Sequence, residues 1–157
     1  MTIAHNGGSA QGIDEISKQI IEQLQEDGRR SYAAIGKAVG LSEAAVRQRV
    51  QKLVDNRTMQ IVAVTDPLQL GFTRQAMIVI VSNEHINDTA ERVAALPEVD
   101  YCVITAGPSD ILAEVVCAND ADLLRVVSEI RAIEGVQSTT TYMYLSLKKQ
   151  EYNWGTR

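Results

Sequence analysis

Three side chains that can contact DNA bases lie on one stripe of a predicted helix. The helix spans residues 42–56, and helical spacing places Ala44, Arg47, Gln48 and Gln51 on the stripe that faces solvent. An arginine can bond O6 and N7 of guanine with two N–H groups, and a glutamine can bond N6 and N7 of adenine in the same way. The base-contacting residues are therefore predicted to be Arg47, Gln48 and Gln51.

Other cations near this stripe suit contacts with phosphate. Such contacts hold a protein in register on DNA without reading its sequence. We assign this positioning role to Ser42, Arg49, Lys52 and Arg57 on and after the helix, and to Arg29, Arg30 and Lys37 before it.

A pair of short helices must position these side chains. The first has apolar residues at helical spacing and ends at Gly40, which can adopt the left-handed C-cap conformation. Ser42 then starts the second helix, because its hydroxyl can accept a hydrogen bond from a free backbone N–H. The buried stripe of the second helix is formed by Val46, Val50 and Leu53. Two helices joined in this way form a helix-turn-helix, whose second helix enters the DNA major groove.

The alternative is that these charges are only the solvated face of an amphipathic helix. The distribution of charge argues against it. Residues 28–60 contain seven Lys and Arg against two Asp and Glu, a balance of +5, whereas residues 66–147 contain four against twelve, a balance of −8. The whole chain has a net charge of −5, so the positive charge is confined to the predicted helix-turn-helix.

Composition and length limit the other classes of function. The 157 residues can hold two small domains, and they contain no apolar run long enough to cross a membrane. The two cysteines, Cys102 and Cys117, lie in apolar β-type runs, which favours buried thiols over a metal site or a disulfide. His5 and His85 have no partner at a catalytic spacing. We expect a cytoplasmic protein without cofactor, metal site or catalytic residues.

The rest of the chain is predicted to form a second domain of different architecture. Residues 1–12 are a flexible leader, residues 13–59 the DNA-binding head with a first helix at 14–26, and residues 60–72 a connector with a strand at 60–65. Beyond it, strands at 76–81, 99–105, 111–117 and 136–147 alternate with helices at 87–96 and 120–133. The order β-α-β-β-α-β predicts a ferredoxin-like domain over residues 73–149, followed by a tail at 150–157.

The predicted first and third strands are apolar on both faces, which one layer of helices does not explain. A second subunit laying its own sheet on the free face is the simplest cover. We therefore expect a homodimer formed through the C-terminal domain. Overall, the fold class is α+β: a helix-turn-helix, winged-helix-like head and a ferredoxin-like domain.

This organisation resembles the Lrp/AsnC, or feast/famine, family of prokaryotic transcription regulators over about residues 14–147. The matching positions, in chain order, are Asp14, Ile20, Leu24, Ile35-Gly36, Val39-Gly40-Leu41-Ser42, Val46, Arg49, Val50, Leu53, Asp66-Pro67, Leu70-Gly71, Gly107, Asp110, Gly135-Val136 and Thr141. The resemblance implies dimers that assemble into tetramers or octamers, and a small effector, commonly an amino acid, bound at subunit interfaces.

On this sequence the effector positions implied by the resemblance are one loop and one strand residue. They are Ala106, Gly107, Pro108, Ser109, Asp110, Ile111 and Thr141. Loop N–H groups near a glycine can approach a carboxylate, and an aspartate can pair with an ammonium. The same loop composition is equally typical of an ordinary tight turn.

The chain departs from the family pattern at three places. Family members commonly have Thr where this chain has Ala106, an aromatic residue where it has Ser109, and Gly near residues 57–59, where it has Arg-Thr-Met. The first two changes reduce the size of the predicted site.

Two other functions remain open at this stage. One is a ferredoxin-like small-molecule-binding or enzymatic protein that does not bind DNA, and the other is an architectural protein that compacts DNA. The first predicts no binding to duplex DNA even at low salt, and the second predicts binding with little sequence preference.

Overall fold

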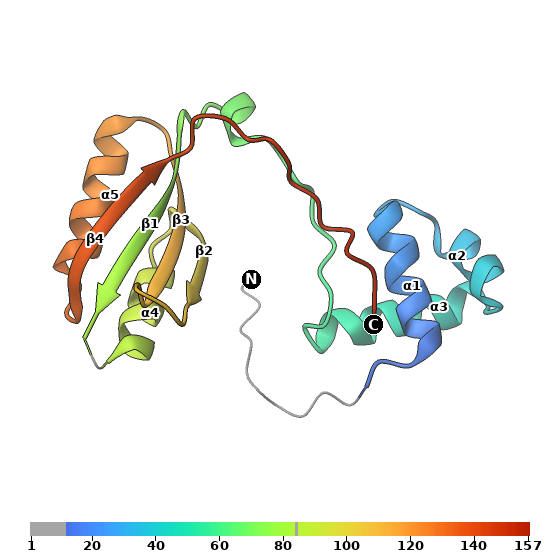
Figure 1. Cartoon of the computed structure of the whole chain (residues 1–157). Helices are drawn as coiled ribbons and strands as arrows, with labels where there is room; N and C mark the ends of the chain where they lie inside the picture. The colour runs from blue at the N-terminus through green and yellow to red at the C-terminus, as the bar shows by residue number, and fades with distance from the viewer. Residues whose placement is uncertain (1–11, 84) are drawn as a thin grey trace. The chain divides into compact units, whose positions relative to one another are not determined.

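The computed structural model describes residues 12–83 and 85–157. The chain forms two compact units, one from the residues up to Ala63 together with Lys149–Arg157, and the other from Val64–Lys148 (Figure 1). Apart from Gly12, the predicted leader lies outside the described residues. Within the part that is described, no helix is long and apolar enough to cross a membrane.

The first unit is a head of three helices, α1 (Glu15–Glu26), α2 (Tyr32–Val39) and α3 (Glu43–Asp55). Each begins at a side chain that accepts a backbone hydrogen bond from three residues further on: Asp14 for α1, Ser31 for α2 and Ser42 for α3. These caps satisfy donors that a helix N-terminus otherwise leaves free. The helices enclose a small core of Ile20, Leu24, Ile35, Val46 and Val50.

The turn between α2 and α3 is closely packed. Gly40 has a φ of +75°, the left-handed conformation expected from the sequence. The Leu41 N–H donates to the Gly36 carbonyl at 2.9 Å, and a Cβ on Gly36 would lie 2.5 Å from the Leu41 carbonyl oxygen. Glycine at position 36 therefore lets the turn fold tightly against α2.

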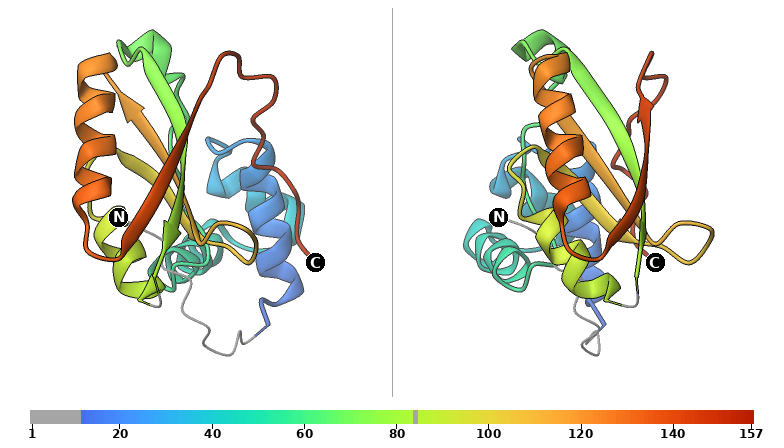
Figure 2. Two further views of the ribbon diagram at one scale, coloured as in Figure 1. Left: turned by 60° about the vertical axis from the view of Figure 1, so that its left-hand side comes forward. Right: turned by 90° about the vertical axis from the view of Figure 1, so that its left-hand side faces the viewer.

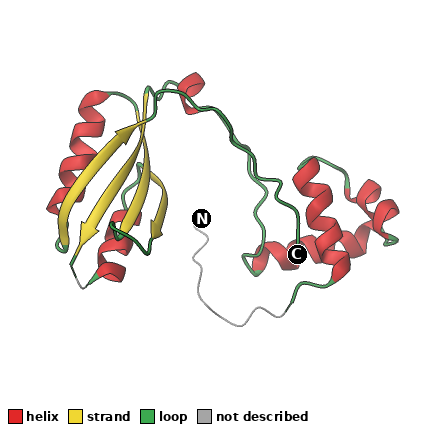
Figure 3. Ribbon diagram, viewed as in Figure 1, coloured by secondary structure: helices red, strands yellow, loops and turns green. Residues whose placement is uncertain are grey.

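The strand predicted at residues 60–65 is wrong, because this stretch is neither helix nor strand. A strand is formed by pairing with another strand, and the strand pairings of the described residues join only β1, β2, β3 and β4 of the second unit. The side chains of Ile61, Val62 and Val64 are consequently 50–66% exposed. Because no strand follows α3 in the head, the head lacks a wing over its described residues, as Figure 3 shows. A 3-10 turn at Pro67–Leu70, capped by Asp66, precedes the sheet.

The second unit confirms the ferredoxin-like prediction. Its elements are β1 (Arg74–Ser82), α4 (Ile86–Ala94), β2 (Val99–Ile104), β3 (Ile111–Cys117), α5 (Asp120–Ala132) and β4 (Val136–Met143). The strands form one antiparallel sheet in the order β2-β3-β1-β4, and both helices cover the same face (Figure 2). β1 is longer than predicted, and β4 ends at Met143 rather than at residue 147.

The two faces of this sheet differ in burial. Ala76, Ile78 and Ile80 of β1 are fully buried beneath the helices. Met77 and Val79, which alternate with them, are only partly buried on the open face. β3 shows the same alternation. One layer of helices thus covers only half of the apolar surface of the central strands.

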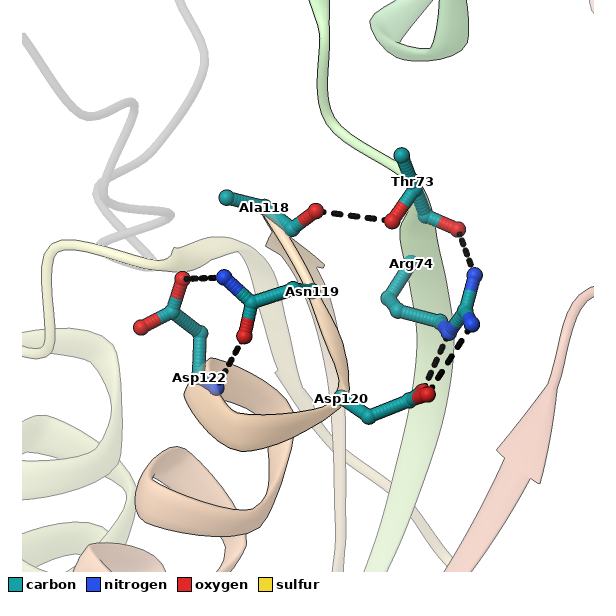
Figure 4. Close-up of polar contacts among 6 residues, drawn as sticks. All are labelled: Thr73, Arg74, Ala118, Asn119, Asp120 and Asp122. Carbon is teal, nitrogen blue, oxygen red and sulfur yellow. Dashed lines mark hydrogen bonds and ion pairs between the residues drawn. The ribbon is translucent and has the colours of Figure 1, made fainter.

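A polar cluster fixes the start of β1 to the start of α5 (Figure 4). Two guanidinium nitrogens of Arg74 donate to the Asp120 carboxylate, and the Nη2···Oδ2 distance is 3.0 Å. Thr73 Oγ1 donates to the Ala118 carbonyl at 2.7 Å. Asn119 caps α5 by accepting the Asp122 N–H at 3.0 Å. These bonds help to hold the end of the sheet that lies nearest the connector.

The C-terminal tail belongs to the head. The Gly155 N–H donates to Gln25 Oε1 at 3.1 Å, and Thr156 Oγ1 donates to Glu22 Oε1 at 2.5 Å. Both acceptors lie on α1. The chain therefore passes from one unit to the other twice, at residues 63–64 and again at residues 148–149.

Candidate nucleic-acid interface and ligand loop

The two stripes of α3 lie as the sequence predicts. Val46, Val50 and Leu53 are buried, while the three predicted base-contacting residues are all exposed. Helical periodicity determines this division, because residues three and four apart share a face. The exposed stripe is therefore available to a partner of the head.

Two neighbouring side chains hold Arg47. Its Nη2 donates to Glu43 Oε1 at 2.8 Å, four residues earlier on α3. Its guanidinium carbon lies 5.2 Å from the centroid of the Tyr32 ring, within the range of a cation–π contact. Tyr32 is the first residue of α2, so the contact joins the two helices of the motif.

Gln51 has a similar partner on its own helix. Its Nε2 donates to Asp55 Oδ1 at 2.8 Å. The amide oxygen is left to accept from other groups, and rotation of the side chain frees the nitrogen.

Arg49 connects α3 to α1. Unlike Arg47 and Gln48, which are exposed, it is partly buried. Its Nη1 donates to Asp14 Oδ2 at 2.6 Å and to Ser17 Oγ at 3.1 Å. The bond from Arg49, together with the Ser17 N–H, lowers the pKa of Asp14 to about 2. The assignment of Arg49 to phosphate is therefore revised, since this guanidinium stabilises the packing of the head.

The other predicted positioning residues differ in exposure and in hydrogen bonding. Lys37, Lys52, Arg29 and Arg57 are exposed. Arg30 is partly buried, and its Nη1 donates to Gln23 and Glu26 of α1 at 2.5 and 3.0 Å. The Ser42 hydroxyl accepts the Ala45 N–H at 3.2 Å, so capping is its role within the chain.

Arg57 lies in the stretch, residues 57–59, where the family pattern has glycine. It has a φ of +57°, the only positive value at a non-glycine residue in the part of the chain described. The Arg57 N–H donates to the Val54 carbonyl, and the Thr58 N–H to the Leu53 carbonyl, both at 2.9 Å. This pair of bonds is the Schellman motif. The end of α3 therefore has the geometry that glycine favours, with arginine in the strained position.

The loop between β2 and β3 is closed by its own hydrogen bonds. The Thr105 N–H donates to the Asp110 carbonyl at 2.8 Å, and Thr105 Oγ1 donates to the Ser109 carbonyl at 2.7 Å. Asp110 Oδ2 accepts the Ser82 N–H at 2.7 Å, which ties the loop to the end of β1. The Asp110 carboxylate thus has a structural role besides any ligand contact.

Three of the predicted effector residues, Ala106, Gly107 and Pro108, are exposed at the tip of this loop. Gly107 does not have a positive φ, and a Cβ there would meet nothing within 4 Å. Ile111 is fully buried in the core, so its predicted contribution to the effector site does not come from an exposed side chain. Its β-strand alternation points it beneath the helices.

Thr141 is not brought to the loop within one chain. Thr141 lies on β4 and pairs with Ile78 of β1. Ile111, next to the loop, lies on β3 and pairs with Ile80 of β1. The strand β1 lies between β3 and β4, so two strand spacings, about 10 Å, separate their backbones across the sheet. Within one chain, Thr141 and the loop are therefore separate parts of the sheet.

Comparison with known proteins decides between the possible functions. Residues 13–54 match the AsnC-type helix-turn-helix domain, and residues 75–154 match the Lrp/AsnC ligand binding domain. The chain belongs to the Lrp/AsnC family. It is a transcriptional regulator with a helix-turn-helix DNA-binding domain and a ligand-binding domain.

Relatives and solved structures agree with the family assignment. An uncharacterised HTH-type transcriptional regulator of Pyrococcus furiosus is 36% identical over 143 residues, which cover 89% of this chain and 97% of the relative. The crystal structure of Mycobacterium tuberculosis LrpA is 25% identical with a TM-score of 0.80, and the match covers 88% of this chain and 96% of that one. A Neisseria meningitidis regulator solved as its L-Met complex shares the fold at 23% identity and a TM-score of 0.74, with 90% and 96% covered.

Sequence reasoning about this Lrp/AsnC regulator missed three residues that shape the head. Asp14 was noted only as a family match, and Tyr32 and Glu43 were given no role toward Arg47. The spacing of Glu43 and Arg47, four residues apart on one helix, was a signal for their ion pair. The contacts of Asp14 and Tyr32 join residues on different helices, which no local pattern reveals.

Proposed function

We propose that α3 of this Lrp/AsnC regulator enters the major groove and contacts base edges through Arg47, Gln48 and Gln51. The observation that carries the proposal is that the three side chains share the exposed stripe of α3, while the opposite stripe is buried in the head. Lys37, Lys52, Arg29 and Arg57 are exposed cations around that stripe and contact phosphates.

Selection of duplexes from a random pool by the full-length protein tests this proposal. Arg47→Ala and Gln48→Ala should each lose about 1–3 kcal/mol of discrimination at particular base pairs. Lys52→Ala should weaken binding to all sequences and reduce the salt slope by about one. If Lys52→Ala changed the selected sequence and Arg47→Ala did not, the assignment would be wrong. Equal enrichment of all sequences would favour an architectural DNA-binding protein.

We also propose that the regulator works as a homodimer formed on the open face of its sheet. Met77, Val79 and Leu112 are only partly buried there, and Tyr142, which pairs with Met77, is 58% exposed. Apolar side chains on this face are stabilised when a second sheet covers them.

The ligand-binding domain is proposed to take an amino acid at the loop of residues 106–110. Gly107 supports this proposal. Its φ is not positive, and a Cβ at this position would meet nothing in the chain, so the fold itself does not require glycine here. Close approach of a ligand carboxylate to the loop N–H groups does favour a residue without a side chain. The Neisseria relative in complex with L-Met shows that a protein of this fold binds an amino acid. Ala106 and Ser109 stand where the family pattern has Thr and an aromatic residue, so the site has less side-chain surface to contact a ligand.

A further inference from the structure

Both acidic residues of the basic segment at residues 28–60 are hydrogen-bonded to predicted base-contacting residues. Glu43 accepts from Arg47 and Asp55 accepts from Gln51, each pair four residues apart on α3. Acidic groups beside a DNA-binding surface are repelled by phosphate, so general affinity does not explain them. Their shared position next to base-contacting side chains points to a role in specificity.

We propose that Tyr32 and Glu43 are positioning residues that hold the Arg47 guanidinium for a guanine. This inference rests on the proposed function, because it requires α3 to lie in the major groove. It goes beyond that function by assigning two residues outside the base-contacting stripe to the choice of base.

Tyr32 provides a fixed surface for the guanidinium. Its ring is partly buried and packs against the core of the head, and it starts a helix capped by Ser31. A guanidinium stacks on such a ring with its N–H groups still directed outward at the edge. A stacked Arg47 therefore has fewer rotamers to lose when it binds, which lowers the entropic cost of the contact.

Glu43 also restricts Arg47. It bonds one terminal nitrogen, Nη2, at 2.8 Å, and the fork of an arginine has five N–H donors in all. Both side chains remain more than half exposed, at 65% for Arg47 and 53% for Glu43, so the pair faces the partner and not the core. The carboxylate also competes with phosphate for Arg47, which disfavours the non-specific contact relative to the guanine contact.

This arrangement has a signature that a purely structural role lacks. Loss of the Glu43 charge should raise affinity for random duplex DNA by about two- to fivefold, since one repulsive charge is removed. The same change should lower the preference for guanine at the Arg47 position by about three- to tenfold. General affinity and specificity therefore move in opposite directions.

The experiment uses the full-length protein and the duplex it selects from a random pool. Arg47→Lys first identifies the base pair whose preference depends on the guanidinium, because lysine keeps the charge and loses the planar fork. Binding is then measured on that duplex, on duplexes with this one pair replaced, and on a random duplex. Tyr32→Leu and Glu43→Gln should each lose preference at the same pair, while Tyr32→Phe should retain it.

A matched control and two distinct failures complete the design. Glu15→Gln removes a comparable first-turn ion pair, that of Glu15 with Lys18 at 2.7 Å on α1, and should change no base preference. If Glu43→Gln and a folded Tyr32→Leu kept wild-type preference where Arg47→Lys loses it, the inference would be overturned. If the wild-type protein selected no sequence at all, the proposed function itself would fail.

Discussion

Arg49 on α3 donates a hydrogen bond of 2.6 Å to Asp14, the residue that caps α1. The same carboxylate also caps α1, because its other oxygen accepts the Ser17 N–H at 2.7 Å. The bond fixes the direction of α3 relative to α1. Arg49, which the sequence suggested for phosphate binding, thus makes a contact that orients α3, the helix proposed to enter the major groove.

Replacing Asp14 with Asn should make the stability of the head change less when the pH is lowered into the acidic range. The hydrogen bonds from Arg49 and Ser17 lower the pKa of Asp14 from 3.8 to about 2, and the bond from Arg49 contributes most. Because the folded pKa is the lower one, the stabilisation is complete above about pH 4 and is lost as the pH falls toward 2. Asp14→Asn keeps the cap and loses the charge, so the variant should be less stable than the wild-type protein at pH 7. This difference in stability should shrink as the pH falls from about 4 to 2. The urea unfolding midpoints of both proteins from pH 2 to pH 7 measure this difference. A difference that did not change with pH would contradict the role of the charge.

Arg57→Gly should stabilise the protein by about 1 kcal/mol, because glycine adopts a positive φ without a Cβ clash. Chemical denaturation of the full-length protein gives the difference in unfolding free energy. Arg57→Ala is the control, since it removes the cation but keeps the Cβ, and it should not stabilise. If both variants stabilised equally, charge and not backbone strain would be the cause.

Val79→Asp should separate the dimer without unfolding the domain. Val79 is partly buried on the open face of β1, so a carboxylate there meets solvent in the single chain but apolar surface in the proposed dimer. Light scattering at micromolar concentration should show a monomer, and circular dichroism should show unchanged secondary structure. Ile80→Asp provides the contrast, because Ile80 is fully buried beneath the helices and its replacement should unfold the domain. A dimeric Val79→Asp protein would place the interface elsewhere.

Two substitutions of Asp110 should separate its structural role from its proposed ligand role. Asp110→Asn retains an acceptor for the Ser82 N–H but cannot pair with an ammonium, whereas Asp110→Ala loses both. Asp110→Ala should cost about 1 kcal/mol of stability, and Asp110→Asn less. A thermal-shift screen of the twenty amino acids should find a ligand for the wild-type protein that stabilises neither variant. If a ligand stabilised Asp110→Asn as strongly as the wild-type protein, the Asp110 carboxylate would not be part of the ligand site.

Local patterns were sufficient for most of the helices and strands and for the faces of the head. The buried stripe Val46, Val50 and Leu53 follows from helical period, and the C-cap at Gly40 follows from the conformational freedom of glycine. The β-α-β-β-α-β order followed in the same way from alternating apolar strands and amphipathic helices. The strand at 60–65 failed, because β-type residues form a strand only when another strand pairs with them.

Contacts between segments distant in the sequence were decided only by the tertiary structure. The charge pattern marked Arg47 and Arg49 alike as cations on one basic helix, yet Arg47 lies over Tyr32 in the exposed stripe and Arg49 is bonded to Asp14. Likewise, loop composition selected Asp110, and only the fold showed that its carboxylate holds the end of β1. The physical reason is that sequence spacing determines which face of its own helix or strand a side chain occupies. The partner it meets there depends on how the helices and strands pack.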